Sequence, residues 1–224
     1  MDGANSRGAG GGNGRPDDGV DQFMSTPLSF AVTWDYRCPF ARNGHEHILD
    51  GLEAGAEWDV TFVPYFLNQG MGTEGQDTWE DPAHQGDLLS LAAGVVVRDR
   101  YPDHFLAAHR SLFTARHDEA GDLRDRTVVH DALARSGVDA DAVLAEVDAG
   151  WPAKVIREEH ERCVEELDIF GVPTFIVGGD AVFARLMNRP EGDGTLARET
   201  IDGVLELINA HPELNEFKHT RLSR

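Results

Sequence analysis

Short runs of β-forming residues flank a helical pattern near the start of the chain. The run PLSFAVT over residues 27–33 predicts a first strand, and WDVTFVPY over residues 58–65 predicts a second. Residues 39–54 predict a helix between them. Pro39 suits its first turn, where the missing N–H costs no hydrogen bond, and Gly55 suits its end.

The pattern becomes helical over residues 87–167. Apolar residues at positions 88, 91, 92, 95 and 96 lie on one face of a first helix, and Tyr101-Pro102 ends it. Four further helices are predicted, the third beginning at Asp122 and the fifth at Pro152, with Gly137 and Gly150 as helix ends. Five consecutive helices predict an all-helical subdomain.

Strands return after this block. Residues 173–177 (PTFIV) and 181–185 (AVFAR) predict two strands joined by a hairpin turn at residues 178–180. Residues 195–210 predict a last amphipathic helix. The chain is therefore divided into a disordered tail (1–26), an α/β core (27–86 and 168–212), a helical insertion (87–167) and a C-terminal tail (213–224).

Composition and charge exclude several partners. The formal net charge is −20, and the basic residues form no cluster, so nucleic acid and membrane surfaces are not expected partners. No apolar run approaches the roughly 20 residues that span a bilayer. Only two cysteines are present and the Gly-rich N-terminus has no apolar signal segment, which predicts a cytoplasmic protein. Met1 and Met24 are both possible starts, and monomer and homodimer both stay open.

Cys38 is the first candidate for chemistry. It directly precedes the helix that begins at Pro39, and unpaired N–H groups at a helix start favour a thiolate. We therefore expect a lowered pKa and a nucleophilic sulfur, with Arg37 and Arg42 adding to the effect. The alternative is an inert, buried cysteine.

The run Gly171-Val172-Pro173-Thr174-Phe175 is a second feature of interest. A proline directly before an apolar strand is compatible with a cis X–Pro bond, which would leave the backbone of Val172 free to pair with a peptide-like ligand. The alternative is an ordinary trans proline that starts a strand.

The remaining candidates are weaker. Cys163 falls on the apolar face of its helix and is expected in the core, with a resolving role as the alternative. His45 and His47 are two apart on a helix and point in different directions, so no metal site is expected.

Taken together, these features resemble the DsbA-like branch of the thioredoxin superfamily. The resemblance rests on WDYRCPFA after the first strand, the helical block, LFTARHDEAGDL over residues 112–123, and GVPTFIV over residues 171–177. It implies a thioredoxin-like fold with an inserted helical subdomain, an attacking thiolate at Cys38, and a cis proline at Pro173 that faces it. Substrate would then lie against residues of the motif and of the proline loop: Trp34, Pro39, Phe40, Ala41, Val172 and Pro173.

One departure from the family affects the expected reaction. Disulfide-exchanging members carry C-x-x-C, whereas Ala41 occupies the fourth position here. The expected activity is a thiol-disulfide oxidoreductase without a tightly bound cofactor, whose mixed disulfide with an unknown substrate is resolved by a small thiol of mycothiol or glutathione type. The chain is also similar to mycothiol-dependent reductases and to kappa-class glutathione transferases and 2-hydroxychromene-2-carboxylate isomerases. A thiol-dependent transferase or isomerase and a non-catalytic binding module are the alternatives.

Overall fold

The computed structural model describes residues 28–70, 78–79 and 81–220 of the chain. The predicted disordered tail, the choice between Met1 and Met24, and the end of the C-terminal tail lie outside these residues. The described part of the C-terminal tail, residues 213–220, forms neither helix nor strand. The boundaries proposed for the core and the insertion stay predictions.

In the described part of the chain, four strands form one mixed sheet in the order β2-β1-β3-β4. β1 and β2 are parallel, with Leu28 opposite Trp58, while β3 pairs antiparallel with both β1 and β4. Parallel neighbours need a crossover, and the helix α1 supplies it between β1 and β2. The bounds are Leu28–Trp34 for β1, Trp58–Pro64 for β2, Thr174–Val177 for β3 and Asp180–Phe183 for β4.

Two helices pack together beside the sheet. α1 spans Pro39–Glu53 and α9 spans Gly194–Ala210, and the two lie against each other along much of their length. Gly51 allows α1 to approach β2 closely, because a Cβ there would lie 2.4 Å from the ring of Trp58, the first residue of that strand. Alternate strand residues that are fully or nearly buried form the sheet's part of the core: Phe30, Val32, Phe62, Phe175 and Val177.

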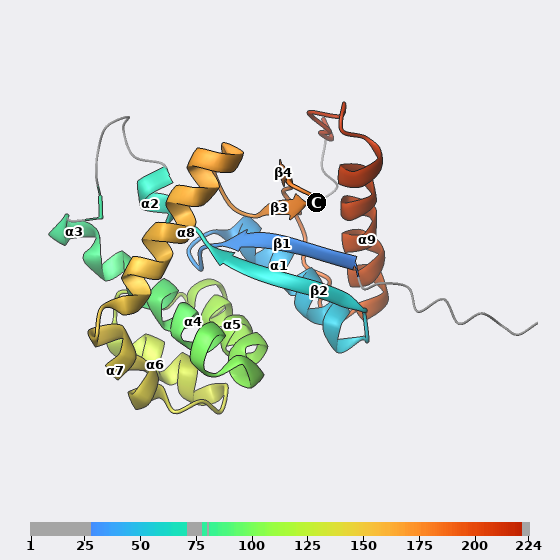
Figure 1. Cartoon of the computed structure of the whole chain (residues 1–224). Helices are drawn as coiled ribbons and strands as arrows, with labels where there is room; N and C mark the ends of the chain where they lie inside the picture. The colour runs from blue at the N-terminus through green and yellow to red at the C-terminus, as the bar shows by residue number, and fades with distance from the viewer. Residues whose placement is uncertain (1–27, 71–77, 80, 221–224) are drawn as a thin grey trace, which may run out of the picture.

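Among the described residues between β2 and β3, five helices of nine or more residues, α4 to α8, follow one another as the apolar periodicity predicts. In Figure 1 the helices α4 to α7 gather on one side of the sheet, and α9 stands on the other. The bounds are Leu89–Arg100 for α4, Pro102–His117 for α5, Arg126–Arg135 for α6, Ala140–Asp148 for α7 and Trp151–Leu167 for α8. The fold-class prediction, a thioredoxin-like α/β fold with an inserted helical subdomain, is confirmed.

Some local predictions differ from the structure. α6 begins at Arg126, because the side chain of Asp125 caps it by accepting from the Thr127 N–H; the predicted start was Asp122. The last strand ends at Phe183, two residues before the predicted end. The sequence pattern also missed three short elements, α2 (Leu67–Gly70), α3 (Pro82–Gln85) and a 3-10 helix (Gly86–Leu88). Within the described ranges, no helix has the length and apolar character needed to cross a membrane.

Candidate active site around Cys38

Cys38 occupies the N-cap position of α1, as predicted. Its backbone is extended (φ −85°, ψ 118°), and its Sγ accepts a hydrogen bond from the Ala41 N–H at 3.4 Å. The Cys38 N–H donates to the carbonyl of Asp35 at 3.1 Å, which closes the turn between β1 and α1. The sulfur is therefore held at the start of the helix, among N–H groups that have no partner within the helix.

The proline loop meets Cys38 in space. The Val172–Pro173 peptide bond is cis, and the Cys38 thiol lies 3.4 Å from the Val172 carbonyl oxygen, to which it donates. Thr33 Oγ1 accepts from the Thr174 N–H at 2.9 Å, which ties the loop to β1. Gly44 permits the approach of the proline, because a Cβ on Gly44 would lie 3.2 Å from Cγ of Pro173. The structure thus brings together the two segments that the sequence singled out.

The prediction of a lowered pKa at Cys38 is wrong in direction. Burial raises the pKa of the thiol, and the opposing effect of the Ala41 and Phe40 N–H groups does not compensate for it. Loss of water around the sulfur penalises the thiolate more than the helix start stabilises it. At rest, the site therefore favours the protonated thiol.

Arg37 does not supply the expected positive charge, because a buried aspartate takes it up. The Asp35 carboxylate accepts from the Arg37 backbone N–H at 2.9 Å, from Nε at 3.2 Å and from Nη2 at 2.9 Å, and also from the Leu67 N–H at 3.1 Å. Arg37 Nη1 lies 3.4 Å from Asp87 as well. Its charge is thus balanced within the loop.

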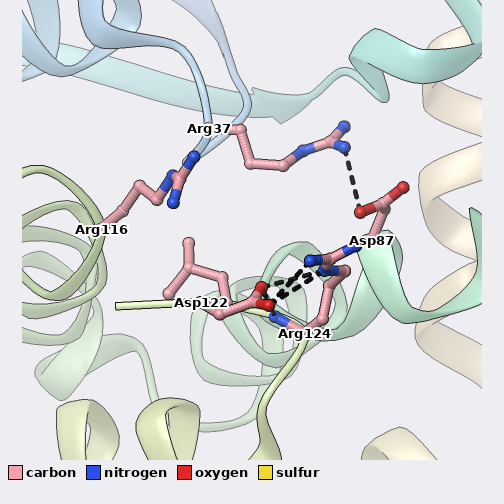
Figure 2. Close-up of a pocket in the computed structure, with 6 residues that line it drawn as sticks. Arg37, Asp87, Arg116, Asp122 and Arg124 are labelled. Carbon is pink, nitrogen blue, oxygen red and sulfur yellow. Dashed lines mark hydrogen bonds and ion pairs between the residues drawn. The ribbon is translucent and has the colours of Figure 1, made fainter. Parts of the chain in front are cut away.

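Figure 2 shows the cavity beside Arg37, with Arg37 next to Asp87 and with Arg124 joined to Asp122. The cavity has a volume of about 340 Å³ and is lined by Arg37, Asp87, Arg116, Asp122, Leu123 and Arg124. Two of its three arginines are paired with its two aspartates, so the lining is polar and largely self-neutralised.

Arg42 is likewise occupied. Its Nε donates to Glu46 at 2.8 Å and its Nη2 pairs with Asp118 at the end of α5. Arg189 lies 3.6 Å from Glu46 and 3.7 Å from Asp118, which completes a network of four charges. This network joins α1 to the helical insertion, and carboxylates balance the charges of both its arginines.

The six residues predicted to contact substrate occupy different environments. Pro39 is exposed, Phe40 is half-buried, and Ala41 contributes only its N–H to the sulfur. Val172 and Pro173 face Cys38 through the backbone. The prediction for Trp34 is wrong: the ring is completely buried and packs edge-on against Phe105 and His109 of the insertion.

A buried chain of hydrogen bonds, which the sequence did not indicate, connects the end of β1 and the turn before Cys38 to α1 and α5. The Thr33 carbonyl can only accept, so His45 Nε2 carries a proton and donates to it at 3.1 Å. His45 Nδ1 then accepts from His109 Nε2 at 2.9 Å, and His109 Nδ1 accepts from the Tyr36 hydroxyl at 2.9 Å. Both imidazoles are neutral, because burial lowers the pKa of His45 to about 4 and that of His109 well below its ordinary value.

Arg185 also lies at the site, although no sequence pattern indicated it. It follows β4, and its guanidinium carbon lies 4.6 Å from the ring centre of Phe40 and 5.4 Å from that of Phe183. Its charge is the cation that lowers the pKa of Cys38, against the larger effect of burial. The strand pattern of residues 181–185 concealed it, because it predicted a regular strand in which Arg185 had no special place.

Neither cysteine is in a disulfide. Cys163 lies buried on α8, as predicted, and burial raises the pKa of its thiol to about 11. Among the described residues, no group of three or more histidine, cysteine, aspartate or glutamate side chains is arranged to hold a metal ion.

These features define a thioredoxin-fold protein with a single cysteine at the start of α1 and a cis proline beside it. Residues 32–188 match the family model of the DSBA-like thioredoxin domain. Because the match covers more than half of the chain, the protein belongs to the family of DSBA-like thioredoxin domains.

Solved structures show the same architecture. BdbD from Bacillus subtilis, in its oxidised form, has a TM-score of 0.55 and 18% identity, over 82% of this chain and 90% of BdbD. The oxidoreductase NmDsbA1 from N. meningitidis has a TM-score of 0.54 and 17% identity, over 87% and 90% of the two chains. MdbA, a thiol-disulfide oxidoreductase from Actinomyces oris, has a TM-score of 0.54 and 16% identity, over 80% and 83%. At such identities the likeness concerns the fold. No curated protein sequence matches the chain significantly.

Proposed function

We propose that the protein is a monothiol thiol-disulfide oxidoreductase in which Cys38 is the nucleophile. The observation that carries this proposal is the position of Cys38: it caps α1 and lies 3.4 Å from the Val172 carbonyl, beside the cis Pro173. Membership of the DSBA-like family supports it. A substrate chain or peptide-like thiol would pair with the backbone of Val172 and bring its sulfur to Cys38.

The reaction needs two exchanges. In the first, the Cys38 thiolate attacks one sulfur of a substrate disulfide, forms a mixed disulfide and releases the other sulfur as a thiolate. In the second, a small thiolate of mycothiol or glutathione type attacks the substrate sulfur, and Cys38 leaves as a thiolate. The product is a disulfide between the substrate sulfur and the small thiol, and Cys38 is again a free thiolate.

The resolving thiol has to come from solution. Ala41 occupies the position where a second motif cysteine would stand, and Cys163 is 5% exposed on α8. A reducing compartment such as the cytoplasm would supply a small thiol at sufficient concentration.

The raised pKa of Cys38 favours a second candidate, a binding module without redox chemistry. A thiol with a pKa above its free value is mostly protonated near neutral pH, which slows attack on disulfides. The same effect makes the remaining thiolate more nucleophilic, so the exchange is slowed but not abolished. The two candidates therefore differ in the rate of disulfide exchange at Cys38, which can be measured.

The test follows mixed-disulfide formation by intact-protein mass spectrometry. The reduced protein is mixed with glutathione disulfide across pH 6–10, and Cys38→Ser and Cys163→Ser are treated alike. We expect one added glutathionyl group in the wild type and in Cys163→Ser, none in Cys38→Ser, and loss of the group on addition of reduced glutathione. Modification slower than that of an unfolded Cys38 peptide at every pH would favour the binding module.

A further inference from the structure

Arg185 differs from the other arginines near Cys38. Arg37 and Arg42 are bound by carboxylates, whereas Arg185 contacts aromatic faces within the described part of the chain. Its side chain is exposed, so the charge is available to a ligand from solution. In a protein with a formal net charge of −20, an available cation beside the candidate nucleophile needs a functional explanation.

Backbone contacts fix the place of Arg185 relative to the site. Phe183 pairs with Thr174 in the antiparallel β3–β4 ladder, and the Ala184 N–H donates to the Pro173 carbonyl at 3.3 Å. Arg185 is the next residue, so its backbone lies directly beside the proline loop that faces Cys38. Its position depends on the same loop as the site, and not on a flexible surface segment.

The aromatic neighbours also determine how the guanidinium can bind. Cations stack over ring faces, and the rings of Phe40 and Phe183 both lie within 6 Å of the guanidinium carbon. A guanidinium that stacks through its face keeps its N–H donors in its own plane, where they remain free. Two parallel N–H donors match the two oxygens of a carboxylate.

We propose that Arg185 binds the carboxylate of the small thiol or disulfide that exchanges with Cys38, so that the site selects anionic thiols of the glutathione type over mycothiol, which has no carboxylate. This inference rests on the proposed function. The carboxylate would be held by the planar N–H donors, and the aliphatic part between carboxylate and sulfur would lie along Phe40. The bound thiol would then present its sulfur to Cys38.

Matched small disulfides test this selection. Reduced protein is mixed with 3,3′-dithiodipropionate (anionic), 2-hydroxyethyl disulfide (neutral) or cystamine (cationic), and the mixed disulfide at Cys38 is followed by mass. In each case the Cys38 thiolate attacks one sulfur and releases the other half as a thiolate. Rates are compared as anionic-to-neutral and cationic-to-neutral ratios, because any change in the reactivity of Cys38 itself cancels in a ratio.

The variants are Arg185→Gln, Arg185→Glu and Arg185→Lys, with Arg198→Gln on the exposed side of α9 as the control for net charge. We expect the anionic-to-neutral ratio to fall about three- to five-fold in Arg185→Gln, a size typical of an exposed charged pair. Arg185→Glu should favour cystamine, Arg185→Lys should restore part of the ratio, and Arg198→Gln should leave it unchanged.

The outcomes separate the two proposals. Ratios that are the same in the wild type and in Arg185→Gln would overturn the inference, even if Cys38 forms all three mixed disulfides. An equal change in Arg198→Gln would also overturn it, because net charge alone would then explain the effect. No mixed disulfide with any of the three compounds in the wild type would instead refute the proposed function.

Discussion

Replacing His109 by phenylalanine should destabilise the protein strongly, although the two rings are similar in size. His109 is completely buried and lies within 5.4 Å of the rings of Trp34, Phe62, Phe105 and Phe113, so the new ring would keep most of this packing. It would not replace the two hydrogen bonds of 2.9 Å to Tyr36 and His45.

The magnitude follows from the two groups left without a partner. The Tyr36 hydroxyl and His45 Nδ1 would stay buried and unpaired, and each such group costs about 1–3 kcal/mol. Better burial of the apolar ring offsets part of this loss, so we expect the free energy of unfolding to fall by about 3 kcal/mol. For a chain of this size, that corresponds to a fall in Tm of roughly 6–12 °C.

Urea unfolding at pH 7.5, followed by tryptophan fluorescence, measures the effect. His130→Phe is the control, because His130 is partly exposed on α6, and a surface substitution should stay within about 0.5 kcal/mol. The double variant Tyr36→Phe/His109→Phe removes the orphaned hydroxyl, so its cost should be at least ~1 kcal/mol smaller than the sum of the single variants. Additive costs, or a loss below ~1 kcal/mol for His109→Phe, would refute the account of this network.

Two further predictions concern the same network. In the unfolded chain, His45 takes up a proton near its ordinary pKa of about 6.5, whereas burial lowers its pKa in the folded protein to about 4. Between these two values the unfolded chain binds the proton more tightly than the folded protein does. Lowering the pH through this window should therefore reduce the free energy of unfolding by up to ~3 kcal/mol. Urea midpoints between pH 7.5 and 5 measure the first ~2 kcal/mol of this loss, and its persistence in His45→Leu would assign it to other groups. Gly94→Ala should cost about 1–3 kcal/mol, because the new Cβ would lie 2.5 Å from the Tyr36 hydroxyl. Gly203→Ala, with open space at its Cβ, is the helix control and should gain about 0.5–1 kcal/mol; equal thermal shifts would contradict the steric explanation.

The secondary structure was predictable where the pattern extends over several turns or a whole strand. The long helices have apolar stripes, and the strands have β-branched and aromatic runs, so local propensity and burial agree. α2 and α3 have four residues each, which is too short for a period to show. Asp122 and Asp125 are both good N-cap residues; Asp122 instead binds the Arg124 side chain at 2.8 Å, and only the structure distinguishes them.

The site was predictable only in part, because its chemistry depends on pairs that are distant in sequence. The approach of Cys38 to Val172 spans 134 positions, and it followed from the family resemblance and not from any local pattern. No sequence signal shows that Arg42 pairs with Asp118, 76 positions away. The basic residues Arg37 and Arg42 therefore suggested a stabilised thiolate at Cys38. In the structure, carboxylate partners balance their charges.

The contact between Cys38 and Val172 connects ligand binding with the state of the sulfur. The thiol donates to the Val172 carbonyl, and a carbonyl oxygen at 3.4 Å stabilises the protonated form over the thiolate. The same carbonyl is the acceptor that an extended ligand backbone would use beside Pro173. A ligand N–H bonded there would compete with the thiol for the oxygen and weaken its hold on the proton. Binding at the proline loop would thus favour the thiolate at the moment when a disulfide lies within reach of it.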